Sequence, residues 1–230
     1  MESLSRSFEA YQEIKRRILD LRLPPGTDFT EGAFAAELGL SKTPIREALA
    51  RLRQEGLVDA MARSGYRVTP VTVKDARDLL GLRTLLEGEA AALAATRGAD
   101  VDELKHLESL CRTSYDPSDR TSIVDFLAAN HAFHMAVAQM SGNTRLESTL
   151  QAVLEQLERV MHLGLSLTSR AEEIVHEHRD LVGAILAGDS ERARSVAVAQ
   201  SHSSQLMVLT ALLSSDAVLT TNLGTIGTPS

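Results

Sequence analysis

The stretch Ser41–Leu49 combines the start of a helix with side chains that could bind phosphate and bases. Pro44 suits the first helical position, where its missing N–H costs nothing, and it biases Thr43 toward the extended torsions of an N-cap residue. Lys42, Thr43 and Arg46 would then project together from the N-terminus of the helix, where backbone N–H groups also attract phosphate. This spacing favours a helix that binds DNA.

The same helix has two faces of different chemistry. Apolar residues recur at helical spacing from Ile45 to Leu52, whereas Arg46 and Arg53 fall on another face. The first face can pack against a core and the second can dock on a partner. The alternative interpretation is a surface helix whose charges are merely solvated.

Charge is distributed unevenly along the 230 residues, whose net charge is −7. Residues 1–74 carry twelve Lys and Arg against ten Asp and Glu, and the remainder carries twelve against twenty-one. Because the basic excess lies at the N-terminus of an acidic chain, we expect a DNA contact that is confined to one face of the N-terminal domain.

The elements around this helix predict a small domain over residues 1–71. An amphipathic first helix ends in a Pro-Pro-Gly turn at Gly26, and a short second helix stops at Gly39. Beyond the third helix, an extended run from Leu57 turns back into Tyr66–Thr69, whose alternation suits a half-buried strand. Three helices followed by a β-hairpin make a winged helix-turn-helix.

Residues 72–213 contain almost no strand signal and predict about six helices separated by capped breaks. Thr72 with Asp75 can cap the first of these helices, and Ser169 can begin a capping box for the fifth. The predicted fold class is therefore mainly α: a winged helix-turn-helix with a small β-hairpin wing, then an all-α helical bundle. Ser, Thr, Gly and Pro dominate residues 214–230, which we expect to be a disordered tail.

Five polar side chains on the otherwise apolar helices of the bundle could converge on one internal cavity. They are Arg83, Asn130, His134, His178 and Gln200. A buried Arg83 would need an anion, which a carboxylate or phosphate ligand could supply through a bidentate contact. From the pattern alone, Arg83 could equally pair with Glu87 one turn away or lie at the surface.

Residues 8–70 resemble the DNA-binding domain of the GntR family of bacterial transcription regulators. The resemblance rests on the Pro25-Gly26 turn, on Ser41 to Leu49, on Leu52 to Leu57 and on the glycine wing Arg63-Ser64-Gly65-Tyr66. It implies that the partner is a double-stranded DNA operator. The candidate DNA-binding residues are Ser41, Lys42, Thr43, Arg46, Arg53, Arg63 and Gly65.

Residues 76–213 resemble the FCD effector domain, which follows this winged helix in one branch of the family. The marks of the resemblance are Leu82-Arg83, Leu86-Glu87, Asn130, Phe133-His134, Ser141-Gly142-Asn143, Glu177-His178 and Ala187-Gly188-Asp189. It implies that residues 72–213 bind a small anionic effector, such as a carboxylate or a sugar acid, and form the dimer. Arg83 would face the anion, and Asn130, His134, His178 and Gln200 would complete the effector site.

In many relatives an Asp and three His from separate helices hold a divalent metal beneath the effector site. His134 and His178 match that set, whereas Asn130 replaces the aspartate and Gln200 stands where the last histidine is expected. The resemblance therefore implies zinc or nickel at Asn130, His134 and His178, although amide oxygens are poorer ligands than a carboxylate. Without a metal, the same four side chains could hydrogen-bond a polar effector directly.

Together these features predict a homodimeric, sequence-specific DNA-binding transcription regulator, and more specifically a repressor whose operator is an inverted repeat. The alternative function is a helical metal-dependent enzyme that carries a DNA-binding module. We do not expect an enzyme, because Cys111 and the serines lack a context that would activate a nucleophile. A single cysteine and the lack of an apolar stretch of about 18 residues predict a cytoplasmic protein without membrane contact.

Overall fold

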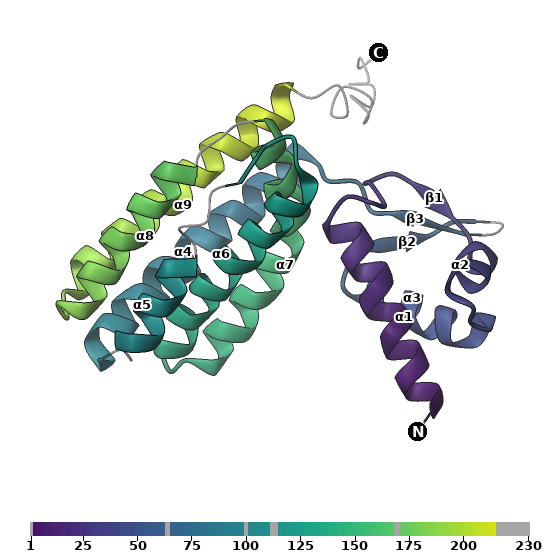
Figure 1. Ribbon diagram of the computed structural model, residues 1–230, viewed down its shortest axis with the longest axis horizontal. Helices are drawn as coiled ribbons and strands as arrows, with labels where there is room; N and C mark the ends of the chain where they lie inside the picture. The colour runs from purple at the N-terminus through teal and green to yellow at the C-terminus, as the bar shows by residue number, and fades with distance from the viewer. Residues whose placement is uncertain (1, 63–64, 99–100, 111–114, 168–170, 215–230) are drawn as a thin grey trace, which may run out of the picture. The chain divides into compact units, whose positions relative to one another are not determined.

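The computed structural model describes residues 2–62, 65–98, 101–110, 115–167 and 171–214 (Figure 1). Its contacts divide the chain into two compact units, with the division between Val71 and Thr72. The sequence pattern places the domain boundary at the same point. Several residues named in the sequence analysis lie outside the described residues: Arg63, Ser64, Cys111, Ser169 and residues 215–230 of the tail.

The N-terminal unit consists of helices and a small antiparallel sheet. Its elements are α1 (Glu2–Leu19), β1 (Asp28–Phe29), α2 (Glu31–Leu38), α3 (Lys42–Gln54), β2 (Val58–Ala60) and β3 (Tyr66–Val68). The sheet order is β1-β3-β2, so the predicted β2–β3 hairpin is confirmed and a third strand pairs with it. The sequence pattern does not predict β1, because a strand of two residues is too short to show alternation.

Helix α3 packs on α1 through the apolar face that its sequence predicts. Ile45, Leu49 and Leu52 are fully buried in one cluster with Ile14 and Ile18 of α1. Burying one such side chain stabilises a fold by about 1.5–3 kcal/mol, so this cluster fixes the orientation of α3. The opposite face of α3 is left to solvent.

The start of α3 differs from the prediction. Thr43 is not the N-cap: that residue is Ser41, with φ −74° and ψ 166°, and the helix begins at Lys42. Pro44 is therefore the third helical residue. Its missing N–H still costs no hydrogen bond, because the N–H groups of the first turn have no acceptor within the helix. Lys42 and Thr43 consequently lie in the first turn of α3.

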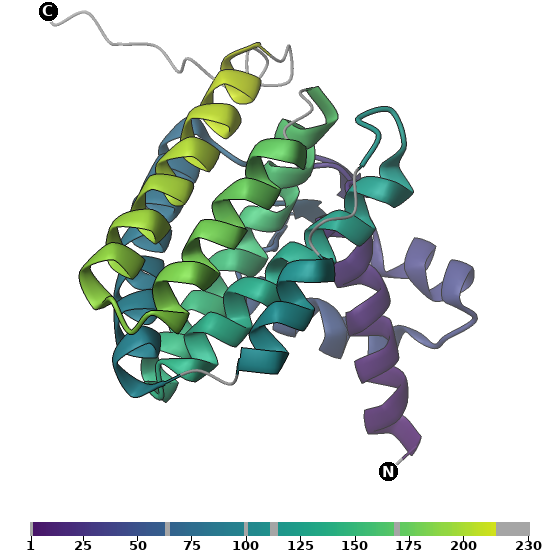
Figure 2. The ribbon, with the colours of Figure 1, turned by 60° about the vertical axis from the view of Figure 1, so that its left-hand side comes forward.

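The C-terminal unit is a bundle with six helices in the described part of the chain, as predicted. They are α4 (Val73–Arg97), α5 (Val101–Leu110), α6 (Arg120–Met140), α7 (Thr144–Leu167), α8 (Ala171–Leu186) and α9 (Ser190–Ser214). Helix α4 packs against α6, α7, α8 and α9, and it lies along α9 in both views (Figures 1 and 2). Gly88 permits this close approach, since a Cβ there would lie 3.0 Å from Cγ2 of Val198 on α9.

Side-chain caps fix where the helices of the bundle begin. The Thr72 hydroxyl accepts a hydrogen bond from the Asp75 N–H at 3.0 Å, which confirms the predicted cap of α4. Helix α6 begins at Arg120. The Asp119 carboxylate accepts a hydrogen bond from the Thr121 N–H at 2.9 Å and so caps the helix at that point.

The core of the bundle combines small residues from α4 with larger ones from the helices around it. Ala91 and Ala94 of α4 are fully buried in one cluster with Phe133 of α6, Leu150 of α7 and Leu181 of α8. Small and large side chains interdigitate in this way to give dense packing. None of the described helices combines the length and the apolar character needed to cross a lipid bilayer.

Candidate DNA-binding face and effector chamber

The start of α3 exposes residues that the sequence predicts to contact DNA. Ser41, Lys42, Thr43 and Arg46 are all exposed, and Arg53 is exposed two turns further along the helix. The apolar side chains between them are turned toward α1. The N-terminus of α3 can therefore offer both backbone N–H groups and cationic side chains to a phosphate.

Arg46 is oriented by two residues that the sequence analysis did not find. Its Nε and Nη2 donate hydrogen bonds to the two carboxylate oxygens of Glu31 on α2, at 3.1 and 2.9 Å. The Tyr66 hydroxyl on β3 donates to the same carboxylate at 3.3 Å. Hydrogen bonding raises the pKa of Arg46 and lowers that of Glu31. Since 65% of the Arg46 side-chain surface is exposed, the guanidinium is held in place and still accessible to a ligand.

Gly65 has a structural role in the wing in addition to its candidate DNA contact. Its φ is +138°, and a Cβ there would lie 2.7 Å from the carbonyl oxygen of Phe29. Its own carbonyl accepts a hydrogen bond from the Met61 N–H at 3.0 Å, which closes the hairpin. The backbone of the wing therefore requires glycine at this position.

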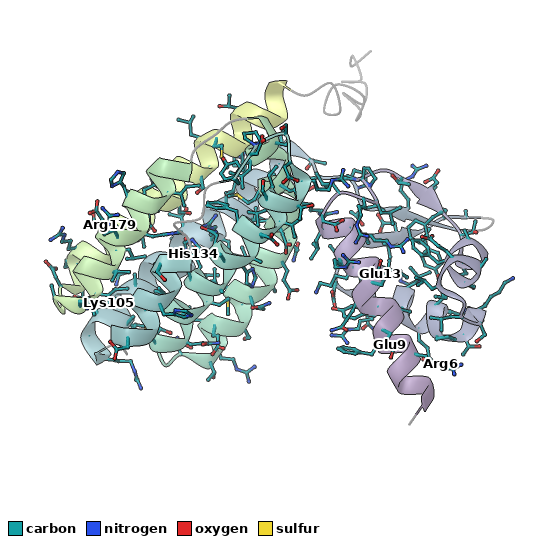
Figure 3. All side chains as sticks on the ribbon, in the orientation of Figure 1. Arg6, Glu9, Glu13, Lys105, His134 and Arg179 are labelled. Carbon is teal, nitrogen blue, oxygen red and sulfur yellow. The ribbon has the colours of Figure 1, made fainter. Side chains whose placement is uncertain are left out.

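In the bundle, the structure brings the five predicted polar side chains together from four helices. One cavity is lined by Arg83 of α4, Asn130 and His134 of α6, His178 of α8 and Gln200 of α9. We call this cavity the chamber. Asn130 is half-buried and the other four are buried, and Figure 3 shows His134 among the helices of the bundle.

The sequence left open whether Arg83 is buried, pairs with Glu87 or lies at the surface. In the structure it is both buried and paired with Glu87. Its Nε donates a hydrogen bond to Oε1 of Glu87 at 2.8 Å. Its Nη2 lies 3.2 Å from Nε2 of His134, and Nδ1 of His134 lies 3.2 Å from the same Glu87 oxygen. The three side chains form one buried network.

This network assigns the state of His134. A guanidinium can only donate, so Nε2 must accept, and the proton of a neutral ring is then on Nδ1, where it can be donated to Glu87. Burial, and next the charge of Arg83, hold the pKa of His134 well below its usual range. His134 is therefore a neutral histidine with both nitrogens engaged.

The other half of the chamber contains buried polar atoms that are not satisfied. Nδ1 of His178 and Oε1 of Gln200 have no hydrogen-bond partner among the described residues. The Gln200 Nε2 donates to the backbone carbonyl of Glu177. Burial, followed by the neighbouring His134, also lowers the pKa of His178 well below its usual range. Buried polar atoms of this kind are expected to meet a water or a ligand.

The donor set does not fit a divalent metal ion. Both nitrogens of His134 are engaged, and a cation at Nε2 would lie beside the positive charge of Arg83. Asn130 and Gln200 bring no negative charge. Within the described ranges, no group of three or more His, Cys, Asp or Glu side chains is arranged to hold a metal. The metal set implied by the resemblance, Asn130 with His134 and His178, is thus not supported by this geometry.

The chamber is nearly filled. Its free volume is about 10 Å³, which is room for about one water molecule. A neighbouring cavity of about 20 Å³ is also lined by Arg83, Leu127, Asn130 and Met161. A carboxylate metabolite could enter only if some of these side chains moved.

The N-terminal unit is a winged helix-turn-helix with an exposed cationic helix, and the C-terminal bundle contains a buried polar chamber. Together they define the class of DNA-binding transcription regulators that carry a ligand-binding domain. Residues 7–68 match the model of the bacterial regulatory proteins of the gntR family, and residues 78–202 match that of the FCD domain. The chain therefore belongs to the GntR family of transcription regulators and carries an FCD domain behind its DNA-binding domain.

Known relatives agree with this assignment. The chain is 33% identical over 192 residues to an uncharacterized HTH-type transcriptional regulator in an unstable DNA locus of Streptomyces ambofaciens, covering 81% of this chain and 78% of the relative. It is 31% identical over 173 residues to a probable D-xylose utilization operon transcriptional repressor of Paenarthrobacter nicotinovorans, covering 75% of each. The fold resembles that of Escherichia coli McbR/YncC with a TM-score of 0.75 at 20% identity, covering 89% of this chain and 97% of that one. The relatives are transcription regulators, so the alternative of an enzyme does not hold.

Proposed function

We propose that this protein is a homodimeric repressor that binds an inverted-repeat operator through α3 and the wing, and that a small carboxylate or sugar acid bound beside Arg83 changes its operator affinity. One observation carries the DNA-binding part. The exposed side chains of Lys42, Thr43 and Arg46 leave the same end of α3, where helix N–H groups favour phosphate. A bacterial protein with this task acts in the cytoplasm, where the chromosome lies.

The repressor assignment is supported by one relative. The protein of Paenarthrobacter nicotinovorans is described as a probable D-xylose utilization operon transcriptional repressor, and the present chain covers 75% of its length. We extend to this chain only the direction of control, namely that the DNA-bound form blocks transcription. The effector that ends the block is then the molecule that binds the chamber.

An anionic effector is supported by the guanidinium that lines the chamber. Among the described residues that line the chamber, Arg83 is the cationic side chain, and it is 2% exposed. A carboxylate can bind a guanidinium through two parallel hydrogen bonds. Hydroxyl groups on the same effector could satisfy Nδ1 of His178 and Oε1 of Gln200. We propose that the chamber works without a metal ion, because the guanidinium already supplies positive charge there.

The dimer is supported by exposed leucines on two helices that pack together. Leu85 on α4 is 72% exposed, and Leu206 on α9 is 71% exposed. Exposed apolar side chains mark an interface where they form one continuous patch. We propose a second copy of this chain as the occupant, because one winged helix reads only a short half-site and two-fold pairing of the protein matches an inverted repeat.

The experiment begins by selecting the operator from randomised DNA with the wild-type protein. The proposal expects an inverted repeat, and fluorescence anisotropy then measures affinity for it at fixed salt. A panel of small carboxylates and sugar acids is added to the complex. A true effector should change the affinity of the wild type while leaving Arg83→Ala bound to DNA and unresponsive. A selection that enriches no sequence would overturn the DNA-binding part, and hits that act equally on Arg83→Ala would overturn the effector site.

A further inference from the structure

We propose that Glu87 is an internal counter-anion, which competes with the carboxylate of an incoming effector for Arg83 and so sets how tightly the chamber binds an anion. This inference rests on the proposed function of the chamber and adds a residue that weakens binding. Removing the negative charge of Glu87 should therefore strengthen the binding of a carboxylate to the chamber.

The first support is the position of the Glu87 carboxylate. Its Oε1 lies 2.8 Å from Nε of Arg83 and 3.2 Å from Nδ1 of His134. Arg83 and Glu87 are one turn apart on α4, and their side chains are 3% and 5% exposed. A carboxylate thus already accepts a hydrogen bond from one N–H of the guanidinium that an effector carboxylate would need.

The second support is charge. With Glu87 ionised, the positive charge of Arg83 is balanced inside the protein. Glu177 also lines the chamber, whereas the other polar side chains there, Asn130, His178 and Gln200 among them, are neutral groups. An added carboxylate would leave an excess negative charge in a buried site, which is strongly unfavourable unless Glu87 yields its place or its charge.

The third support is space. The chamber has a free volume of about 10 Å³, and the neighbouring cavity that shares Arg83 and Met161 has about 20 Å³. Neither holds a carboxylate group together with its carbon chain. Rotation of the Glu87 side chain away from Arg83 would release both a volume and two hydrogen-bond donors, Nε of Arg83 and Nδ1 of His134.

The alternative role for Glu87 is to hold the Arg83 guanidinium in position for the effector. The Nη1 of Arg83 has a long contact of 4.0 Å with Sδ of Met161, so an effector could approach that edge while Glu87 holds the guanidinium still. The two roles differ in the sign of one effect. If Glu87 competes, Glu87→Gln tightens carboxylate binding; if Glu87 positions Arg83, the same change weakens it or leaves it unaltered.

Acetate is the probe, because it is a bare carboxylate, and acetamide is its neutral control of similar shape. The thermal unfolding temperature of the full chain is measured against the concentration of each, since a ligand that binds the folded state raises it. We expect acetate to bind Glu87→Gln about tenfold or more tightly than the wild type, and acetamide to act alike on both. Glu89→Gln is the matched control, because Glu89 lies on the same helix but pairs with Arg194 and is 45% exposed.

A double variant, Arg83→Met with Glu87→Gln, separates binding at the guanidinium from a general effect of salt, and it should not respond beyond that general effect. If Glu87→Gln and the wild type respond to acetate equally, or the wild type responds more, the proposal is wrong. If Glu87→Gln does not fold, it is refolded in each additive: recovery in acetate but not in acetamide supports the proposal, and recovery in neither overturns it. A screen that finds no effector for the wild type would remove the proposed function and leave the acetate comparison standing.

Discussion

Nε2 of His134 lies 3.2 Å from Nη2 of Arg83, so a ring nitrogen that a metal would need already accepts a hydrogen bond from a guanidinium. The other ring nitrogen faces Glu87 at 3.2 Å. A metal ion could bind either nitrogen only by displacing a charged neighbour. The chamber of this chain is therefore built around an arginine, and we expect the proposed effector to contact the guanidinium first.

Metal removal should have no effect on this protein. We expect a chelator to leave both the unfolding temperature and the operator affinity unchanged, because Arg83 occupies the place of positive charge beside His134. The measurement is thermal unfolding before and after chelation, together with the metal content of the purified chain. One zinc or nickel per chain, whose removal lowers the unfolding temperature and whose return restores it, would contradict this expectation.

The free energy of unfolding should fall as the pH is lowered from 7 to 5.5. Burial is the largest cause that holds the pKa of His134 and of His178 well below the usual range. Such a histidine binds more protons in the unfolded state, so below about pH 6.5 each lowers stability by up to about 1.4 kcal/mol per pH unit. Burial raises the pKa of Glu87, which acts in the opposite direction because the folded state then holds the extra proton.

The contribution of one histidine is measured by comparing a histidine variant with the wild type. Both proteins keep Glu87, so its opposite contribution to the pH dependence is present in each. His178→Asn should show a smaller dependence of stability on pH than the wild type, as measured by chemical denaturation at several pH values. His176→Asn is the control, since His176 is exposed on the same helix. Equal slopes for His178→Asn and the wild type would show that the neutral, buried state of His178 does not contribute to stability.

Gly65→Ala should destabilise the N-terminal unit by about 1–3 kcal/mol, since the new Cβ would clash with the Phe29 carbonyl in a backbone conformation that disfavours alanine. Gly32→Ala is the matched control. It is the second residue of α2, and its Cβ would have no neighbour nearer than 3.9 Å, so it should change the stability of the unit by less than about 1 kcal/mol. Thermal unfolding followed by circular dichroism distinguishes the two. Equal stabilities would mean that the wing does not approach β1 as described.

Leu85→Glu should convert the proposed dimer to a monomer at micromolar concentration, because a charge would replace an exposed leucine of the proposed interface. Light scattering measures the mass of each protein. The control is Leu186→Glu, since Leu186 is also exposed but lies at the end of α8. A Leu85→Glu protein that stays a dimer would place the interface elsewhere, and a monomeric wild type would remove the dimer itself.

Local patterns in the sequence were sufficient to predict α3 and the wing, because helical periodicity and glycine positions are local properties. The contact of Glu31 with Arg46 was not predictable in the same way, since it depends on how α2 meets α3 in space. In the bundle, the spacing of Arg83 and Glu87 allowed them to meet, but it did not reveal that their face of α4 is buried. The metal expectation came from the resemblance, and the contact between Arg83 and His134 argues against it.

The operator affinity of Arg46→Ala, measured by fluorescence anisotropy at fixed salt, tests whether α3 reads DNA. We expect a loss of about tenfold to a hundredfold with the fold and the oligomeric state unchanged, because an exposed and oriented guanidinium is removed. Arg51→Ala is the control on the same helix: its guanidinium lies 3.8 Å from the centre of the Tyr11 ring of α1, and its loss should weaken binding much less. A folded Arg46→Ala protein that binds the operator as tightly as the wild type would contradict the assignment of α3 as the DNA-reading helix.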